Sequence, residues 1–226
     1  MNALYEKYRP HTFDDVVGQD KAVATIKRII KREGWGGQAW WLSGISGCGK
    51  TTLARIIASI GADDYCIDEF DCGDVLSMDD LARLDRALSF YGWGLTSKTG
   101  RAVIVNEAHG LRAAPLRRLL GMLERIPSHV AWIFTTTCEG QEKLVDDQTD
   151  ASPLLSRSHE IRLSSQGLCK PFASLAQSIA KAEGLDGKPL AAYEALAKEN
   201  HNNLRRMLMA IADRRMMEVS ECQPIR

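Results

Sequence analysis

The sequence predicts an α/β protein with a five-stranded parallel sheet, followed by a small helical domain. Short apolar runs alternate with helical patterns up to residue 163, which is typical of strands joined by crossover helices. One glycine-rich segment, Gly44–Thr51, lies between an apolar run and a helical pattern. After residue 163 only helical patterns remain, so we expect two domains, 1–163 and 164–226.

Composition and charge limit the classes of function. The chain has 226 residues, of which 45% are hydrophobic and 26% charged, as in an ordinary folded protein. Its formal net charge is zero, so a contact with DNA would need a local basic face or several assembled copies. We see no signal peptide and no apolar run near the roughly 20 residues that cross a bilayer. We therefore expect a cytoplasmic protein without membrane contact.

The first elements are read from apolar spacing and from breakers. Residues 1–19 are predicted to be irregular, because they are polar and contain proline and glycine. A helix is expected over Asp20–Arg32, where Val23, Ile26 and Ile30 form one apolar stripe. Glycines then end the helix, and Ala39–Ser43 has the length and apolarity of a buried parallel strand.

The remaining elements follow in the same alternating order. Ser77 opens one of the helices, with acidic residues in the first turn that complement the helix dipole. A polar connection is expected over Glu139–Pro153. Further strands are expected over Tyr65–Phe70, Ala102–Val105, Val130–Thr135 and His159–Leu163, and helices over Thr52–Ile60, Ser77–Phe90, Pro115–Arg125, Leu168–Glu183, Pro189–Glu199 and Asn203–Met217.

The glycine-rich segment fits the phosphate-binding pattern G-x-x-x-x-G-K-[ST]. Its glycines let the backbone N–H groups turn toward a phosphate, and the following helix adds its positive end. Lys50 would reach the β- and γ-phosphates, and the Thr51 hydroxyl would bind the metal. We therefore predict ATP with Mg²⁺ as ligands. The expected contacts are Gly44, Ile45, Ser46, Gly47, Cys48, Gly49, Lys50, Thr51 and Thr52.

An acidic partner for this loop follows the strand Ala102–Val105. A phosphate-hydrolysing site of this type needs polar groups at the end of a neighbouring strand. Asn106 would hold a metal-bound water, and Glu107 would orient the attacking water. These residues predict an ATPase.

Two segments around this loop resemble the clamp-loader ATPases of the AAA+ superfamily, such as replication factor C small subunits and DNA polymerase III gamma/tau. Val103–Pro127 resembles the Walker B strand and the helix after it, and residues 8–19 resemble the adenine-pocket signature. The resemblance extends from Tyr5 to about Met217, and it implies an AAA+ module followed by a helical lid. The adenine-pocket residues that it implies are Tyr8, Arg9, Pro10, Val16 and Val17.

The resemblance implies three further site residues. Thr137 falls at the sensor-1 position, after the strand that ends near Thr136. Arg157 matches the arginine that enters a neighbouring subunit's ATP site, and Arg205 matches the sensor-2 arginine of the lid. An ordinary solvated arginine is the alternative at both arginine positions.

The sequence also departs from the family pattern. Asn106 stands where the family usually has aspartate, so we expect slow hydrolysis that Glu107, Lys50 and Thr51 still sustain. The zinc module of bacterial gamma-type subunits is not seen, and we expect no collar domain after the helical domain. Assembly would then run through the AAA+ modules alone or with a collar from a partner, unless the protein is not a loader.

Four basic residues are candidates for contact with DNA phosphates, and solvated charge is an equal alternative for them. They are Lys98, Arg112, Arg117 and Arg118. The predicted function is that of an AAA+ subunit coupling ATP to assembly on DNA, a sliding clamp or both during replication. The alternatives are an AAA+ ATPase of recombination, repair or mobile-element replication without a clamp, and a weakly hydrolysing nucleotide-binding adaptor. The expected partners are other AAA+ subunits, in a homo- or hetero-oligomer.

Overall fold

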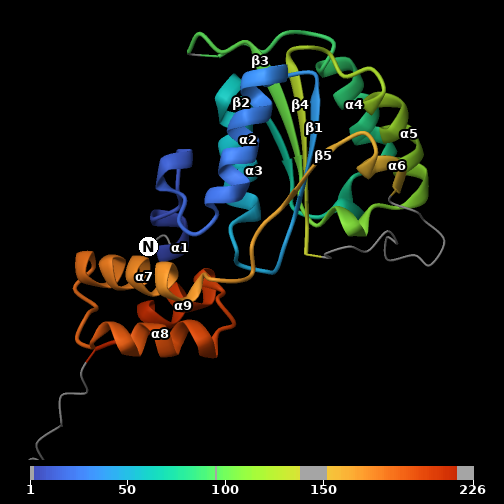
Figure 1. The fold of residues 1–226 in the computed structure, drawn as a ribbon. Coiled ribbons are helices and arrows are strands. Elements are labelled where there is room, and N and C mark those ends of the chain that lie inside the picture. The colour runs from blue at the N-terminus through green and yellow to red at the C-terminus, as the bar shows by residue number, and fades with distance from the viewer. Residues whose placement is uncertain (1–2, 95, 138–151, 218–226) are drawn as a thin grey trace, which may run out of the picture. The chain divides into compact units, whose positions relative to one another are not determined.

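The computed structural model describes residues 3–94, 96–137 and 152–217 (Figure 1). The chain divides into two compact units. An α/β unit comprises residues 10–15 and 19–163, and a helical unit comprises the described parts of 1–9, 16–18 and 164–226. The sequence predicts that the amino-terminal residues belong to the α/β domain, whereas residues 3–9 and 16–18 group with the carboxyl-terminal helices.

The α/β unit contains a five-stranded sheet in the order β2-β3-β4-β1-β5. Every neighbouring pair of strands is parallel, which confirms the predicted fold class. The order places β1, which precedes the glycine-rich loop, between β4 and β5 inside the sheet. The strands are β1 Gln38–Ser43, β2 Ala62–Phe70, β3 Gly100–Val105, β4 Val130–Thr136 and β5 His159–Arg162.

Helices cover both faces of this sheet (Figure 1). The helices α2 (Asp20–Glu33) and α3 (Lys50–Gly61) pack on one face, and α4 (Met78–Ala87) and α5 (Ala113–Leu123) cover the other. Side chains of a strand alternate between the faces, so Trp41 packs in the core below α4 and α5. The short helix α6 (Ser152–Leu155) and 3-10 turns at Phe13–Asp15, Gly73–Val75 and Ala108–Gly110 complete the unit.

The strand β2 begins at Ala62, three residues before the predicted start at Tyr65. The acidic residues in this stretch disfavour strand structure in isolation. The structure accommodates one of them, Asp63, because its carboxylate accepts hydrogen bonds from the Thr96 backbone N–H (3.0 Å) and hydroxyl (2.5 Å). The pairing of β2 with β3 is irregular between Ala62 and Ile67. Of the predicted polar connection, residues 139–151 lie outside the described residues.

The helical unit consists of α7 (Cys169–Ala182), α8 (Leu190–Glu199) and α9 (Leu204–Ala212), with α1 (Leu4–Lys7) packed against α9. The helix α1 corrects the prediction of an irregular amino terminus, because one turn is too short to show apolar periodicity. Glu183 holds the α1 segment by accepting hydrogen bonds from Lys7 (2.6 Å) and Tyr8 (2.5 Å). The Lys7 hydrogen bond lowers the pKa of the Glu183 carboxyl.

The end of α9 also differs from the prediction. The helix stops at Ala212 rather than near Met217, because Arg214 adopts a left-handed conformation with φ 61°. Within the described parts of the chain, no helix has both the length and the apolar character that spanning a membrane requires.

We predict that Ser77→Ala lowers the free energy of unfolding by about 1 kcal/mol, because Ser77 caps α4. Its hydroxyl accepts from the Asp80 backbone N–H at 3.1 Å, and the Asp80 carboxylate accepts from the Ser77 backbone N–H at 3.1 Å. The Ser77 hydroxyl lowers the pKa of the Asp80 carboxyl, so this stabilisation is present above the unfolded-state pKa and is lost as pH falls through the folded-state pKa. Urea unfolding at neutral and acid pH measures both effects. Ser89→Ala, at the other end of α4, should change stability by less than about 0.5 kcal/mol.

Candidate functional site

The glycine-rich loop between β1 and α3 has the backbone geometry of an anion cradle. Gly44, Gly47 and Gly49 have φ values of 153°, 77° and 107°, which glycine adopts at little cost. A Cβ atom at Gly44 would lie 3.0 Å from the Cys48 sulfur and 3.0 Å from the Leu163 Cβ. The sequence pattern at these positions is therefore required by the conformation of the loop.

The loop leads directly into α3, which begins at Lys50. Lys50 is only 6% exposed, and its ammonium group donates to the Gly44 carbonyl (2.8 Å) and the Ile45 carbonyl (3.0 Å). Gln19, which the sequence analysis did not select, supports the loop by donating to the Cys48 carbonyl at 3.2 Å. A buried ammonium group beside the amino end of a helix fits a phosphate-bearing ligand.

Parallel register brings the polar residues after three strands to the same edge of the sheet. Ser43 of β1 lies beside Thr136 of β4, and Val105 of β3 lies beside Phe134 of β4. The hydroxyl of Thr51, in the first turn of α3, donates a hydrogen bond of 3.3 Å to the side-chain oxygen Oδ1 of Asn106. An alcohol and an amide oxygen fit the hard oxygen ligands and ligand-bound waters of Mg²⁺.

Glu107 combines an unfavourable backbone conformation with a carboxylate that is held by a hydrogen bond. Its φ of 45° is left-handed, a conformation that costs a non-glycine residue about 1–3 kcal/mol and that clusters at functional sites. Its carboxylate accepts a hydrogen bond from Thr137 (3.1 Å) and lies 3.3 Å from the His109 Nδ1. The side chain is still 37% exposed. A carboxylate that is oriented but accessible can position a water molecule.

Two residues of this cluster were missed by the sequence analysis. The buried Thr135 donates to the Asn106 carbonyl oxygen at 3.0 Å, and Glu69 of β2 accepts from the Asn106 amide at 2.8 Å. An available signal was a polar residue near the carboxyl end of each predicted strand. The second strand was selected only as a structural element.

Arg157 lies at the amino ends of the strands, whereas the glycine-rich loop lies at their carboxyl ends. It precedes β5, whereas the loop follows β1, and these two strands are parallel. A strand rises about 3.3 Å per residue, so the four residues of β5 keep Arg157 away from the loop of the same α/β unit. Its guanidinium group donates to Glu124 at 2.6 Å and to the Pro153 carbonyl at 2.8 Å.

The predicted adenine-pocket residues are divided between the two units. Pro10 belongs to the α/β unit, whereas Tyr8, Arg9, Val16 and Val17 belong to the helical unit. The Arg9 guanidinium pairs with the Glu6 carboxylate.

Arg205 also belongs to the helical unit, where it lies 5.3 Å from the centre of the Tyr5 ring. The residues before it have a structural reason for their identity. Asn202 has a φ of 57°, which asparagine tolerates better than most residues. Asn203 caps α9 by accepting from the Arg206 backbone N–H at 3.1 Å.

The four candidate DNA residues do not form one group. Arg112 immediately precedes α5, while Arg117 and Arg118 are on α5 itself, and Arg112 and Arg117 are exposed. Lys98 precedes β3, whereas Arg112 follows it, so they lie near opposite edges of the sheet. Lys98 donates to the Ser59 carbonyl at 2.6 Å.

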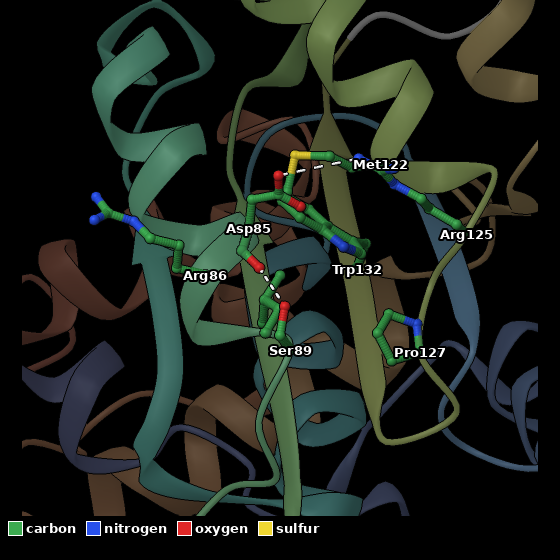
Figure 2. A pocket seen from close by; sticks show the side chains of 8 residues that line it. Asp85, Arg86, Ser89, Met122, Arg125, Pro127 and Trp132 are labelled. Carbon is green, nitrogen blue, oxygen red and sulfur yellow. Dashed lines mark hydrogen bonds and ion pairs between the residues drawn. The ribbon is translucent and has the colours of Figure 1, made fainter.

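A pocket of about 440 Å³ lies beside α4 and α5 (Figure 2). Asp85, which lines this pocket, pairs with Arg118 at 3.6 Å and with Arg125 at 4.0 Å. The pocket is lined by Asp85, Arg86, Leu88, Ser89, Met122, Arg125, Pro127 and Trp132. None of these residues belongs to the glycine-rich loop or to the polar residues at the carboxyl ends of the strands, so we do not assign the pocket to the candidate site.

The fold is similar to that of solved RuvB structures. The Holliday junction branch migration motor RuvB of Thermotoga maritima superimposes with a TM-score of 0.68 over 91% of this chain and 64% of that chain, at 23% identity. An identity this low establishes the likeness of fold and nothing about activity.

Sequence relatives confirm the resemblance to clamp-loader ATPases of the gamma/tau type. DNA polymerase III subunit gamma/tau of Mycobacterium bovis is 34% identical over 160 residues, which cover 60% of this chain and 27% of the relative. DNA polymerase III subunit gamma of Buchnera aphidicola is 30% identical over 153 residues, 59% of this chain and 42% of the relative. The chain thus matches less than half of the length of these relatives, and no family model matches it.

Proposed function

We propose that this chain binds ATP with Mg²⁺ at the Gly44–Thr51 loop and hydrolyses it. The observation that carries the proposal is the contact of Thr51, which follows Lys50 on α3, with Asn106, which precedes Glu107 after β3. A glycine cradle, a buried ammonium group and an oriented carboxylate are three of the components that sites of phosphoryl transfer to water use.

Each residue has a separate role in the proposal. The backbone of the loop and Lys50 hold the β- and γ-phosphates, and Thr51 and Asn106 hold Mg²⁺ directly and through water. When bound, the metal neutralises charge on the phosphate oxygens. Glu107 orients the attacking water, and Thr137 fixes the position of the Glu107 carboxylate.

We further propose that the chain acts in DNA replication as one subunit of a clamp-loader-type assembly in the cytoplasm. The relatives named as DNA polymerase III subunits support this role. Under this role, nucleotide recognition also involves Tyr8, Arg9, Val16, Val17 and Arg205.

A second candidate function is a nucleotide-binding adaptor that hydrolyses ATP very slowly. Asn106 favours it, because an amide accepts a hydrogen bond from a metal-bound water but brings no negative charge. ATP turnover by the assembled protein separates this candidate from the first.

We predict that Glu107→Gln lowers steady-state ATP turnover by about 100-fold or more, because an amide cannot take a proton from water. Nucleotide affinity should change by less than about threefold, since phosphate and metal contacts come from other residues. A phosphate-release assay and the binding of a fluorescent ATP analogue measure the two quantities.

Glu160→Gln, on the exposed side of β5, is the matched control and should retain the wild-type rate. Equal, background-level turnover in the wild type and the Glu107→Gln variant would support the adaptor instead. Absence of nucleotide binding by the wild type would refute both candidates.

We propose that Arg157 acts in the ATP site of a neighbouring subunit. Its place at the amino ends of the strands supports a role in trans, because the loop of its own α/β unit is at the carboxyl ends. In that role it neutralises charge that develops on the γ-phosphoryl group.

We predict that Arg157→Ala lowers turnover of the assembled protein by about 100-fold or more. Mixing it with Lys50→Ala should restore part of the activity, since each variant supplies what the other lacks. Arg162→Ala, five residues along the chain, is the control that should retain activity. An Arg157→Ala protein with wild-type turnover, or a mixture without recovery, contradicts the role in trans.

We propose that Arg117 and Arg118 contact DNA phosphates. Phosphate contacts are salt-dependent, so Arg117→Ala/Arg118→Ala should reduce the slope of log affinity against log salt by about 1 to 2. Arg28→Ala/Lys31→Ala, which removes two exposed charges from α2, should leave the slope unchanged. An unchanged slope for the α5 pair would reject the contact.

A further inference from the structure

Glu69, the residue before the last of β2, contacts the side chain of Asn106. It lies beside Ile104 in the register between β2 and β3, so its side chain is next to the residues that follow β3. Its carboxylate oxygen Oε1 accepts a hydrogen bond of 2.8 Å from the Asn106 side-chain amide. Glu69 is therefore one hydrogen bond away from the group that faces Thr51.

This contact determines which way the Asn106 amide faces. A carboxylate only accepts hydrogen bonds, so the nitrogen of Asn106 must point toward Glu69. The carbonyl oxygen then faces the other side, where the hydroxyls of Thr135 (3.0 Å) and Thr51 (3.3 Å) donate to it. Asn106 is 7% exposed, and a reversed amide would place its oxygen against the Glu69 carboxylate, so that two acceptors would face one another without a donor.

The orientation matters because the two ends of an amide are chemically opposite. A metal-bound water donates hydrogen bonds, so it needs an acceptor from the protein. An aspartate offers an acceptor on either side, whereas an asparagine offers one only when its oxygen faces the water. An asparagine at this position therefore needs a neighbour that fixes its orientation.

We propose that Glu69 is a positioning residue, which holds the Asn106 carbonyl oxygen toward Thr51 and the metal-bound water. The inference rests on the proposed function of the Gly44–Thr51 loop. It identifies Asn106 and Glu69 as a matched pair that lets an amide occupy a position usually taken by a carboxylate.

Glu69 is itself held in place from α3. Arg55 donates to both of its carboxylate oxygens, at 2.8 Å and 3.2 Å, and the Glu69 side chain is 21% exposed. Arg55 and Thr51 are four residues apart on α3 and so share one helix face. The contacts Thr51–Asn106–Glu69–Arg55 therefore form a closed ring that starts and ends on the helix after the loop.

A purely structural ion pair between Glu69 and Arg55 is the competing explanation, and a double-mutant cycle distinguishes the two. Glu69→Gln has a side chain that can donate or accept, so it no longer fixes the Asn106 amide. In an Asn106→Asp background, the residue at 106 has two equivalent oxygens and needs no orientation. A structural role would make Glu69→Gln equally harmful in both backgrounds.

The experiment measures binding of a slowly hydrolysed fluorescent ATP analogue, with and without Mg²⁺, to the four full-length proteins of the cycle. We expect Glu69→Gln to raise the Mg²⁺ concentration for half-maximal binding by about tenfold, the size of one hydrogen bond. In the Asn106→Asp background the same change should not raise it, because it removes a carboxylate from beside the one introduced at position 106. Within each background, Glu69→Gln should not lower affinity without Mg²⁺.

Asp68→Asn is the matched control, because Asp68 precedes Glu69 on β2 but pairs with Arg83 of α4 at 3.6 Å. It should not change the Mg²⁺ requirement. A Glu69→Gln shift no larger than that of Asp68→Asn, or an equal shift in both backgrounds, would overturn the inference. If Glu69→Gln does not fold, Glu69→Asp, which withdraws the carboxylate by one methylene, completes the same cycle. A wild-type chain that binds no nucleotide would refute the proposed function itself.

Discussion

The parallel register of β1, β3 and β4 is the constraint on which the candidate site depends. Because these strands are neighbours and run in one direction, their carboxyl ends are level. The residues that follow them therefore meet without long side chains, and hydrogen bonds near 3 Å join Thr51, Asn106 and Glu107 to neighbouring elements. A shift of register by one residue would turn every side chain of a strand to the other face.

Local sequence motifs predict much of this arrangement. The Gly44–Thr51 pattern could be predicted because left-handed glycines and a helix amino terminus leave a local signature. The five strands were also found, since buried parallel strands are short and nearly continuous apolar runs. The resemblance to clamp-loader ATPases supplied Thr137, which the structure places against the Glu107 carboxylate.

Contacts between distant segments could not be read in the same way. Glu69 is one acidic residue in an acidic stretch, and only strand order places it beside Asn106, 37 positions along the chain. Thr135 looked like part of a β-branched strand, and its hydroxyl became significant once β3 and β4 were paired. The helix α1 was missed because four residues carry no periodicity, and its stability comes from packing against α9.

Under the proposed function, the two ends of the strands would carry different parts of the chemistry. The carboxyl ends of the strands hold the loop and the groups proposed to orient metal and water, whereas the amino ends carry Arg157, which donates to Glu124. A site that lacks an arginine guanidinium at the γ-phosphoryl group binds ATP but stabilises the transition state poorly. An assembly that presents the amino edge of one subunit to the carboxyl edge of the next would complete the site. Such heterologous contacts generate rings or spirals, so hydrolysis would report whether a neighbour is in place.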